Sequence, residues 1–208
     1  MAENVTHDCF YDTHEMFQYE HFLDKEIVAE VNMQFNKCDV SDAWVIDPSP
    51  HVDVRGQFMR SWCEREFAEH SIIFRPVQGN MAFSIKRGTL RGLHYQMAPA
   101  LEAKLVRCTR GSVFDVVADL RPDSPTYLKW YGTELSTENG RMLFIPEGCA
   151  HGCLSLVDTS EILYLTSAFY VPECARGARF DDPALSIQWP INVSVVSDQD
   201  RNWPFITN

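Results

Sequence analysis

The stretch Glu161-Ile162-Leu163-Tyr164-Leu165-Thr166-Ser167-Ala168-Phe169-Tyr170 has the two-residue period of a β-strand. Its even-numbered side chains, from Ile162 to Tyr170, would lie on one face of the strand, and its odd-numbered side chains on the other. Short apolar runs of this kind recur about every 8 to 12 residues from Ser41 onward, separated by Gly, Pro, Asn and Asp. The pattern predicts a mostly-β sandwich or barrel.

Other segments fit around this β-rich region. We expect further strands at Val113–Leu120 and Cys153–Val157 and a short helix within Ser61–His70. The first 38 residues lack this β-strand pattern. Their sequence predicts one helix over Asp24–Phe35 with Asp24 as its N-cap. We therefore expect an N-terminal helical extension, residues 1–38, followed by one β domain, residues 39–208.

The composition excludes several classes of protein. A chain of 208 residues that is 45% apolar can bury one substantial core. Its net charge of −11 argues against nucleic acid or an anionic membrane as the partner. There is no apolar run of about 20 residues and no signal-peptide pattern at Met1–Phe10, which predicts a cytoplasmic protein. The seven cysteines form no CxxC motif and are expected to be reduced thiols.

Two histidines lie where small and polar residues interrupt apolar runs. They are His94 in Arg91–Gln96 and His151 in Ile145–Gly152. A neutral imidazole can act as a general base near pH 7, although an isolated histidine can equally be structural. The second segment resembles a motif of cupin barrels, many of which bind metal. A metal cupin would need His-x-His where this chain has His94-Tyr95-Gln96, so no metal is expected.

A longer series of motifs occurs in one order along the chain. It comprises Arg91–Gln96, Lys104–Arg107, Gly111–Val116, Ser124–Thr126, Glu138-Asn139, Ile145–Gly152, Leu163-Tyr164, Asp182-Pro183 and Trp189-Pro190. This series resembles the dTDP-4-dehydrorhamnose 3,5-epimerase family from about Asp39 to Arg201. The resemblance implies a cupin jelly-roll barrel without metal or cofactor, working as a homodimer. It also implies that the substrate is a nucleotide-diphospho-4-keto-6-deoxyhexose, which the enzyme epimerises through an enolate.

The resemblance also assigns catalytic roles. His94 matches the general base and Asp200 the carboxylate that orients it, while Tyr164 matches the acid on the opposite face of the sugar. Lys104 would stabilise the enolate oxygen. His151 with Asp115 resembles a second histidine–aspartate pair near the ketone.

Substrate binding is assigned in the same way. Arg91 and Arg55 would hold the diphosphate, because guanidinium groups bind phosphate oxygens in pairs. The remaining positions that the resemblance marks for binding are Phe58, Arg60, Gln78, Asn80, Gln96 and Tyr170. Since Arg91 and His94 are three residues apart, a regular strand would point them to opposite faces, so we expect a bulge at Gly92.

Some positions depart from the family pattern. Family members commonly have Gln-Asp-Asn-His where this chain has Gln78-Gly79-Asn80-Met81, and Lys where it has Leu165, from which we expect a pocket of different polarity. Arg60 stands where a glutamate is usual. An arginine can donate to cytosine but cannot accept from thymine, which suggests a CDP-linked substrate such as a 3,6-dideoxy-4-hexulose. Alternatively, Arg60 pairs with Glu64 on the surface.

Three other functions remain open at this point. The enzyme could invert C3 or C5 alone, or the chain could be a binding homologue that has lost catalysis. The four positions His94, Lys104, Tyr164 and Asp115 argue against the binding homologue, because binding alone does not need an opposed acid and base. A metal-dependent cupin oxygenase is the last alternative.

Overall fold

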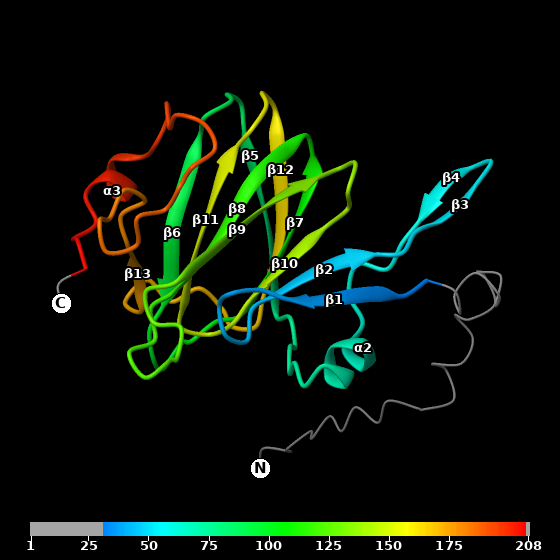
Figure 1. Ribbon diagram of the computed structural model, residues 1–208, viewed down its shortest axis with the longest axis horizontal. Coiled ribbons are helices and arrows are strands. Elements are labelled where there is room, and N and C mark those ends of the chain that lie inside the picture. The colour runs from blue at the N-terminus through cyan, green and yellow to red at the C-terminus, as the bar shows by residue number, and fades with distance from the viewer. Residues whose placement is uncertain (1–30, 207–208) are drawn as a thin grey trace, which may run out of the picture.

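The computed structural model describes residues 31–206 and is built mainly from antiparallel β-strands in two sheets (Figure 1). One sheet has the order β1 (Met33–Lys37), β2 (Trp44–Pro48), β10 (Met142–Ile145), β7 (Lys104–Arg110), β12 (Ser160–Thr166), β5 (Gln78–Ser84). The other has the order β13 (Ala175–Gly177), β6 (Leu90–Gln96), β11 (Cys149–Ser155), β8 (Ser112–Asp119), β9 (Trp130–Ser136). Most neighbours in each sheet are distant in sequence, as in a jelly roll, which confirms the predicted fold class.

The main core lies between the two sheets. Val106 and Ile162 point into it from the six-stranded sheet, and Val113 and Val117 do so from the five-stranded sheet. All four are at most 4% exposed. This packing follows from the alternation of apolar residues along each strand, because one face of every strand must be buried.

The outer face of the six-stranded sheet is partly covered by the short helix α2 (Glu64–Glu69), which lies inside the segment predicted to be helical. Phe67 is its buried residue, and its ring lies 6.0 Å from that of Phe74 and 5.9 Å from that of Phe144 on β10. These contacts anchor α2 against the end of the sheet that carries β1 and β2.

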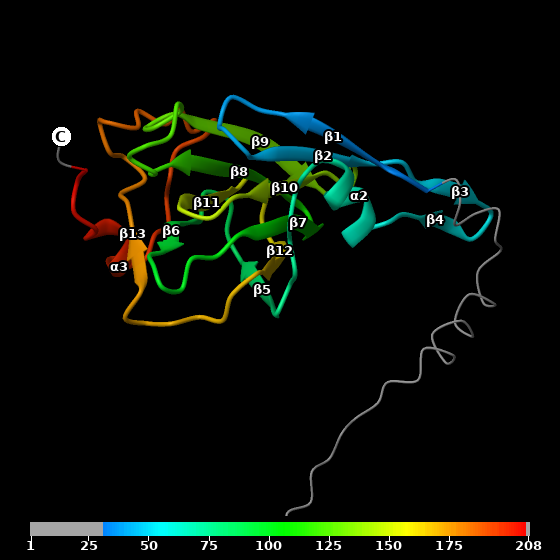
Figure 2. The same cartoon turned by 90° about the horizontal axis from the view of Figure 1, so that it is seen from below.

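A two-stranded hairpin, β3 (His51–Asp53) and β4 (Gly56–Phe58), projects beyond the barrel in both views (Figures 1 and 2). Its apolar side chains are exposed: Val52 is 69% exposed and Val54 is fully exposed. The turn is closed by an ion pair in which Arg55 Nε donates to Asp53 Oδ2 at 2.9 Å.

The prediction of a helix over Asp24–Phe35 is wrong for its last residues. Met33–Lys37 form β1, and Phe35 lies opposite Ile46 of β2. The rest of the predicted helix, up to residue 30, lies outside the described residues. The strand forms at Phe35 because its backbone can pair with β2 while its ring stacks 4.2 Å from that of His70. Within residues 31–206, no helix is long and apolar enough to cross a membrane.

Candidate active site

A cavity of about 790 Å³ opens between the two sheets and receives side chains from both. Arg91 and His94 enter it from β6 of the five-stranded sheet. Asn80 and Tyr164 enter it from β5 and β12 of the six-stranded sheet. The even-numbered face of β12 therefore points inward at Ile162, Tyr164 and Thr166, as its alternation predicted, although the strand ends at Thr166.

A β-bulge in β6 brings Arg91 and His94 to the same cavity. His94 pairs with His151 and Arg91 with Cys153, so three steps along β6 match two along β11. The bulge that the sequence required is thus confirmed. Gly92 within it has φ +124°, and a Cβ there would lie 2.6 Å from the Cα of Gly152. Only glycine fits this conformation and this close approach.

His94 is held by a buried aspartate. Its Nε2 lies 2.6 Å from Asp200 Oδ1, and Asp200 Oδ2 accepts the backbone N–H of Gly92 at 3.2 Å. Asp200 lies in the short helix α3 (Asp198–Arg201), whose N-cap Ser197 accepts the backbone N–H of Asp200. Burial alone raises the pKa of Asp200, but its hydrogen bonds to His94 and Gly92 outweigh this and lower it. Asp200 therefore stays ionised beside the imidazole.

A second histidine–aspartate pair lies on the adjacent strands. His151 Nε2 is 2.8 Å from Asp115 Oδ1, and both side chains are buried. Asp115 Oδ2 is buried without a hydrogen-bond partner among the described residues. The two imidazoles are therefore presented side by side, each fixed through Nε2 by its own carboxylate.

Lys104 and Tyr164 complete the polar lining. Lys104 is buried, with 5% of the residue exposed. Its ammonium group donates to the backbone carbonyl of His94 at 3.1 Å and forms an ion pair with Glu102 at 3.0 Å. The pKa of Tyr164 is raised, first by burial and then by the nearby charge of Glu102, so its hydroxyl remains protonated at neutral pH. A protonated phenol facing a cavity can donate a proton.

The expected binding residues fall into different groups. Arg91 is fixed by Ser84 Oγ at 3.3 Å and the Phe83 carbonyl at 2.9 Å. Gln78 donates to Asn80 Oδ1 at 3.1 Å, and both line the cavity.

Two further expected residues meet near the cavity rim. Tyr170 lines the cavity and is 60% exposed. Gln96 also lines it but is 2% exposed, and its amide binds the carbonyls of Ala100 and Phe169 and the N–H of Val171. Gln96 therefore fixes the loop that carries Tyr170.

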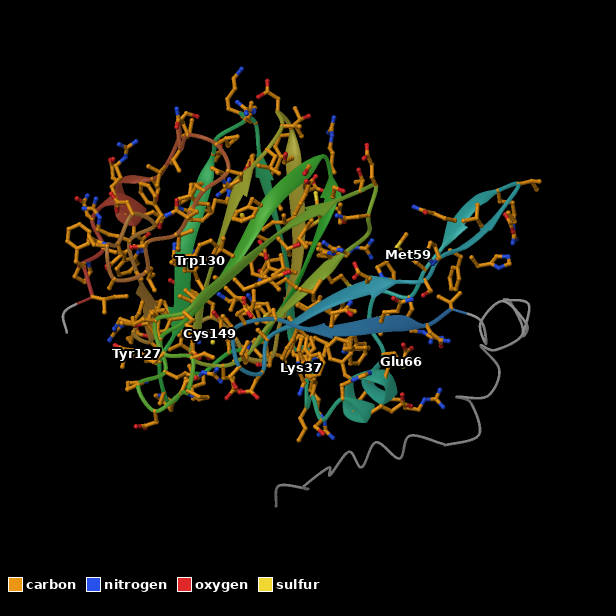
Figure 3. The ribbon with its side chains drawn as sticks, viewed as in Figure 1. Lys37, Met59, Glu66, Tyr127, Trp130 and Cys149 are labelled. Atoms are coloured by element: carbon orange, nitrogen blue, oxygen red, sulfur yellow. The ribbon has the colours of Figure 1, made fainter. Side chains whose placement is uncertain are left out.

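Three predicted binding residues lie apart from this cavity. Arg55 and Phe58 belong to the projecting hairpin and its strand β4. Arg60 follows Met59, which lies near the base of the hairpin (Figure 3). It forms an ion pair with Glu66 of α2, rather than with Glu64. Within a single chain these residues do not join the site.

The departures from the family pattern do not change the cavity, contrary to our expectation. Gly79, Met81 and Leu165 are not among the residues that line it. Gly79 lies opposite Leu165, and Met81 opposite Leu163, on β5 and β12. Asn80 and Tyr164, which lie next to these positions in the strands, point into the cavity. Since consecutive residues in a strand point to opposite faces, these positions belong to the outer face of the sheet. The departures therefore make this outer face more apolar.

Some cavity residues were missed by the sequence reading. They include Glu102, Cys153, Arg176 and Trp203. Glu102 precedes Lys104 by two residues, and the same two-residue period that identified β12 could have placed both on one face. Trp203 follows the last strand, and no local pattern indicates its position. Among residues 31–206, no group of three histidine, cysteine, aspartate or glutamate side chains could hold a metal ion.

The comparisons with known proteins agree with one another. The family model described as dTDP-4-dehydrorhamnose 3,5-epimerase matches residues 37–208. A protein of that name from Methanothermobacter thermautotrophicus is 43% identical over 173 residues, covering 82% of this chain and 92% of that protein. The Bacillus anthracis enzyme of that name, solved with TDP and PPi bound, has a TM-score of 0.81 at 34% identity. The match covers 84% of this chain and 100% of that one. The 3'-monoepimerase ChmJ from Streptomyces bikiniensis, solved with dTDP-quinovose, has a TM-score of 0.76 at 33% identity. The match covers 82% of this chain and 86% of that one.

Proposed function

The chain belongs to the dTDP-4-dehydrorhamnose 3,5-epimerase family, and from this premise we propose that it epimerises a nucleotide-diphospho-4-keto-6-deoxyhexose in deoxysugar biosynthesis. The C4 ketone of such a sugar acidifies the hydrogens at C3 and C5. A base can remove one of them to give an enolate, and reprotonation from the opposite face inverts the carbon. This chemistry needs a base, an opposed acid and a positive charge at the enolate oxygen.

One observation carries the proposal. The His94–Asp200 pair and the protonated Tyr164 enter a single cavity from opposite sheets. A non-catalytic sugar-nucleotide binder has no need of an acid and a base on opposite walls. We therefore favour catalysis over the binding homologue.

The steps follow from these positions. His94 accepts the proton from carbon, and its imidazolium is stabilised by ionised Asp200. The electron pair of the C–H bond forms the enolate, whose oxygen is stabilised by the ammonium of Lys104. Tyr164 then gives its hydroxyl proton to the other face of the carbon, and the enolate returns to the ketone. His94 and Tyr164 exchange protons with water to restore the starting state. His151, held by Asp115 through Nε2, would lie near the ketone.

We propose that the nucleotide is dTDP and that Arg91 binds its diphosphate. The related structures named above contain TDP or dTDP-quinovose. Arg60 remains the observation that favours a CDP-linked substrate instead. Its guanidinium forms an ion pair with Glu66 of α2 instead of pointing to a nucleotide base. This ion pair weakens the argument for cytosine and therefore supports dTDP over CDP.

The active unit in this proposal is a cytoplasmic homodimer. An apolar strip runs along β5 and the residue that follows it, at the edge of the six-stranded sheet, and consists of Met81 (63% exposed), Phe83 and Ile85. The hairpin exposes Val52 and Val54 as well, so both features would be covered by a second copy. The hairpin would then bring Arg55 and Phe58 to the partner's cavity. The six described cysteines are free thiols, as a cytoplasmic location requires.

The test is hydrogen exchange in deuterated water. dTDP- and CDP-linked 4-keto-6-deoxyhexoses are offered separately, and C3 and C5 are followed by NMR. We expect deuterium at C5, with or without C3, that depends on His94 and is lost in His94→Asn. The configuration of the labelled carbons in the recovered sugar gives the number of centres inverted, and the faster substrate identifies the nucleotide base. A folded protein that binds these nucleotides without any exchange would refute catalysis and leave the binding homologue.

A further inference from the structure

Glu102 places a buried carboxylate at the reacting end of the cavity. Its side chain is 10% exposed, lines the cavity and lies 3.0 Å from the ammonium of Lys104. Burying a pair of charges is costly, and a carboxylate weakens the stabilisation that Lys104 can give to an enolate. Lys104 is also anchored independently by the His94 carbonyl. The position of Glu102 is therefore unfavourable unless the carboxylate has a task of its own.

The carboxylate has spare capacity for that task. An ionised carboxyl group offers two oxygens and about four acceptor positions. Lys104, which contacts Oε1, is its one hydrogen-bonding or ion-pair partner within residues 31–206. A substrate group that binds the remaining acceptor positions must be a donor, and it must lie next to whatever Lys104 binds.

The chemistry of the substrate class supplies one such donor. With the ketone oxygen at Lys104, the neighbouring ring positions are C3, which carries a hydroxyl group, and C5, which carries a methyl group and the ring oxygen. Only the C3 hydroxyl can donate a hydrogen bond. The ketone and hydroxyl oxygens of an α-hydroxyketone lie side by side, as do the ammonium and carboxylate of Lys104 and Glu102.

We infer, on the basis of the proposed function, that Glu102 accepts a hydrogen bond from the C3 hydroxyl and selects 3-hydroxy substrates over 3-deoxy substrates. A site that holds a charged acceptor for a hydroxyl group penalises the analogue without it, because the acceptor is left without its partner. This preference is the reverse of that expected for an enzyme of 3,6-dideoxy-4-hexuloses.

The test combines a variant with a pair of substrates. The full-length protein and Glu102→Gln are assayed for C5 inversion with dTDP-4-keto-6-deoxyglucose and with its 3-deoxy analogue. We expect the wild-type protein to prefer the 3-hydroxy substrate by roughly 10- to 100-fold in kcat/KM. Glu102→Gln should reduce that ratio about 10-fold. Glu173→Gln, which removes an exposed carboxylate from the loop between β12 and β13, should leave the ratio unchanged.

The ratio separates the inference from a role in positioning Lys104. Both substrates carry the ketone, so a carboxylate that acts only through Lys104 would change both rates by the same factor, and an unchanged ratio in Glu102→Gln would overturn the inference. Dissociation constants for the two substrates give the same comparison without turnover. If the wild-type protein turned over neither substrate, the proposed function would fail. Equal affinities for the two sugars would then overturn the inference as well.

Discussion

His94 and His151 are register partners on β6 and β11, and a different aspartate holds the Nε2 atom of each ring. Asp115 reaches His151 from the neighbouring strand β8, whereas Asp200 reaches His94 from α3, after the last strand of the chain. Two adjacent imidazoles can therefore differ in task, because separate segments control their orientation and charge.

Replacing Asp200 by asparagine tests the base. The variant keeps the shape of the side chain but loses the charge that stabilises the His94 imidazolium, so we expect kcat/KM to fall by about 10² to 10⁴. Asp198→Asn changes an exposed carboxylate of the same helix and should leave the rate unchanged. The measurement is the initial rate of deuterium incorporation at C5. Equal rates for the two variants would remove Asp200 from the mechanism.

Replacing Tyr164 by phenylalanine separates proton removal from inversion. His94 can still take the proton and return a deuteron to the same face, so exchange at C5 should continue. Inversion should fall by about 10² to 10⁴ because the opposite face lacks its acid. NMR of the recovered sugar reports both quantities in one sample. If exchange and inversion fell together, Tyr164 would have to act before or during proton removal.

Two glycines with the same φ of +124° make a matched pair for the close approach of β6 to β11. Gly92→Ala adds a Cβ 2.6 Å from Gly152, whereas at Gly56 in the hairpin nothing lies within 4 Å. Both variants incur the backbone cost, but only Gly92→Ala must also displace β11. We expect Gly92→Ala to lower the free energy of unfolding by about 1–3 kcal/mol more than Gly56→Ala. Urea denaturation at pH 7 measures the difference.

The buried Asp119 gives the barrel a pH dependence. Burial alone raises the pKa of Asp119, but hydrogen bonds from Arg121, Ser124 and Thr126 prevail and hold it well below its usual range. A lowered pKa in the folded state contributes stability that is fully present above about pH 4 and is lost as the pH falls.

We therefore expect Asp119→Asn to cost about 3–5 kcal/mol of unfolding free energy at pH 7, because it leaves Arg121 without its buried partner. The deficit should shrink at pH 3, because the Asp119 carboxyl group of the unfolded chain is protonated there while that of the folded protein stays ionised. Urea denaturation at both pH values provides the comparison. A deficit that stayed constant between them would exclude an ionised Asp119 as the source of the stability.

The apolar strip on β5 predicts how the dimer is broken. Met81→Asp places a charge within this strip and should convert a dimer into monomers, because a charge without a partner is costly in an interface. Tyr127→Asp, which alters a 39% exposed side chain between β8 and β9 of the other sheet, should remain dimeric. Sedimentation velocity over a range of concentrations measures the state of each variant. A dimer that survived Met81→Asp would place the interface on another surface.

The sequence predicted what depends on local pattern. The alternation through Ile162, Tyr164 and Thr166 placed Tyr164 on an inward face correctly, and the three-residue spacing of Arg91 and His94 required the observed bulge. At Met33–Phe35 a helical spacing misled, because tertiary pairing with β2 decides the conformation there.

The remaining errors concern faces and distant contacts. The alternation in β12 already puts Leu165 on the face opposite Tyr164, but the position of Gly79 beside Leu165 depends on the pairing of β5 with β12, which are far apart in the chain. The contact of Arg60 with Glu66 likewise depends on where α2 packs. Such contacts depend on tertiary structure that no short motif encodes.

The position of Asp200 has a consequence for the order in which the protein matures. Both sheets are complete by Gly177, yet the carboxylate that orients His94 arrives only with α3. During synthesis the barrel can close before its base has a partner. Removal of the residues from Ser197 onward would spare all the described strands and take that partner away, so a shortened chain would keep every strand of its barrel and lose the group that orients its base.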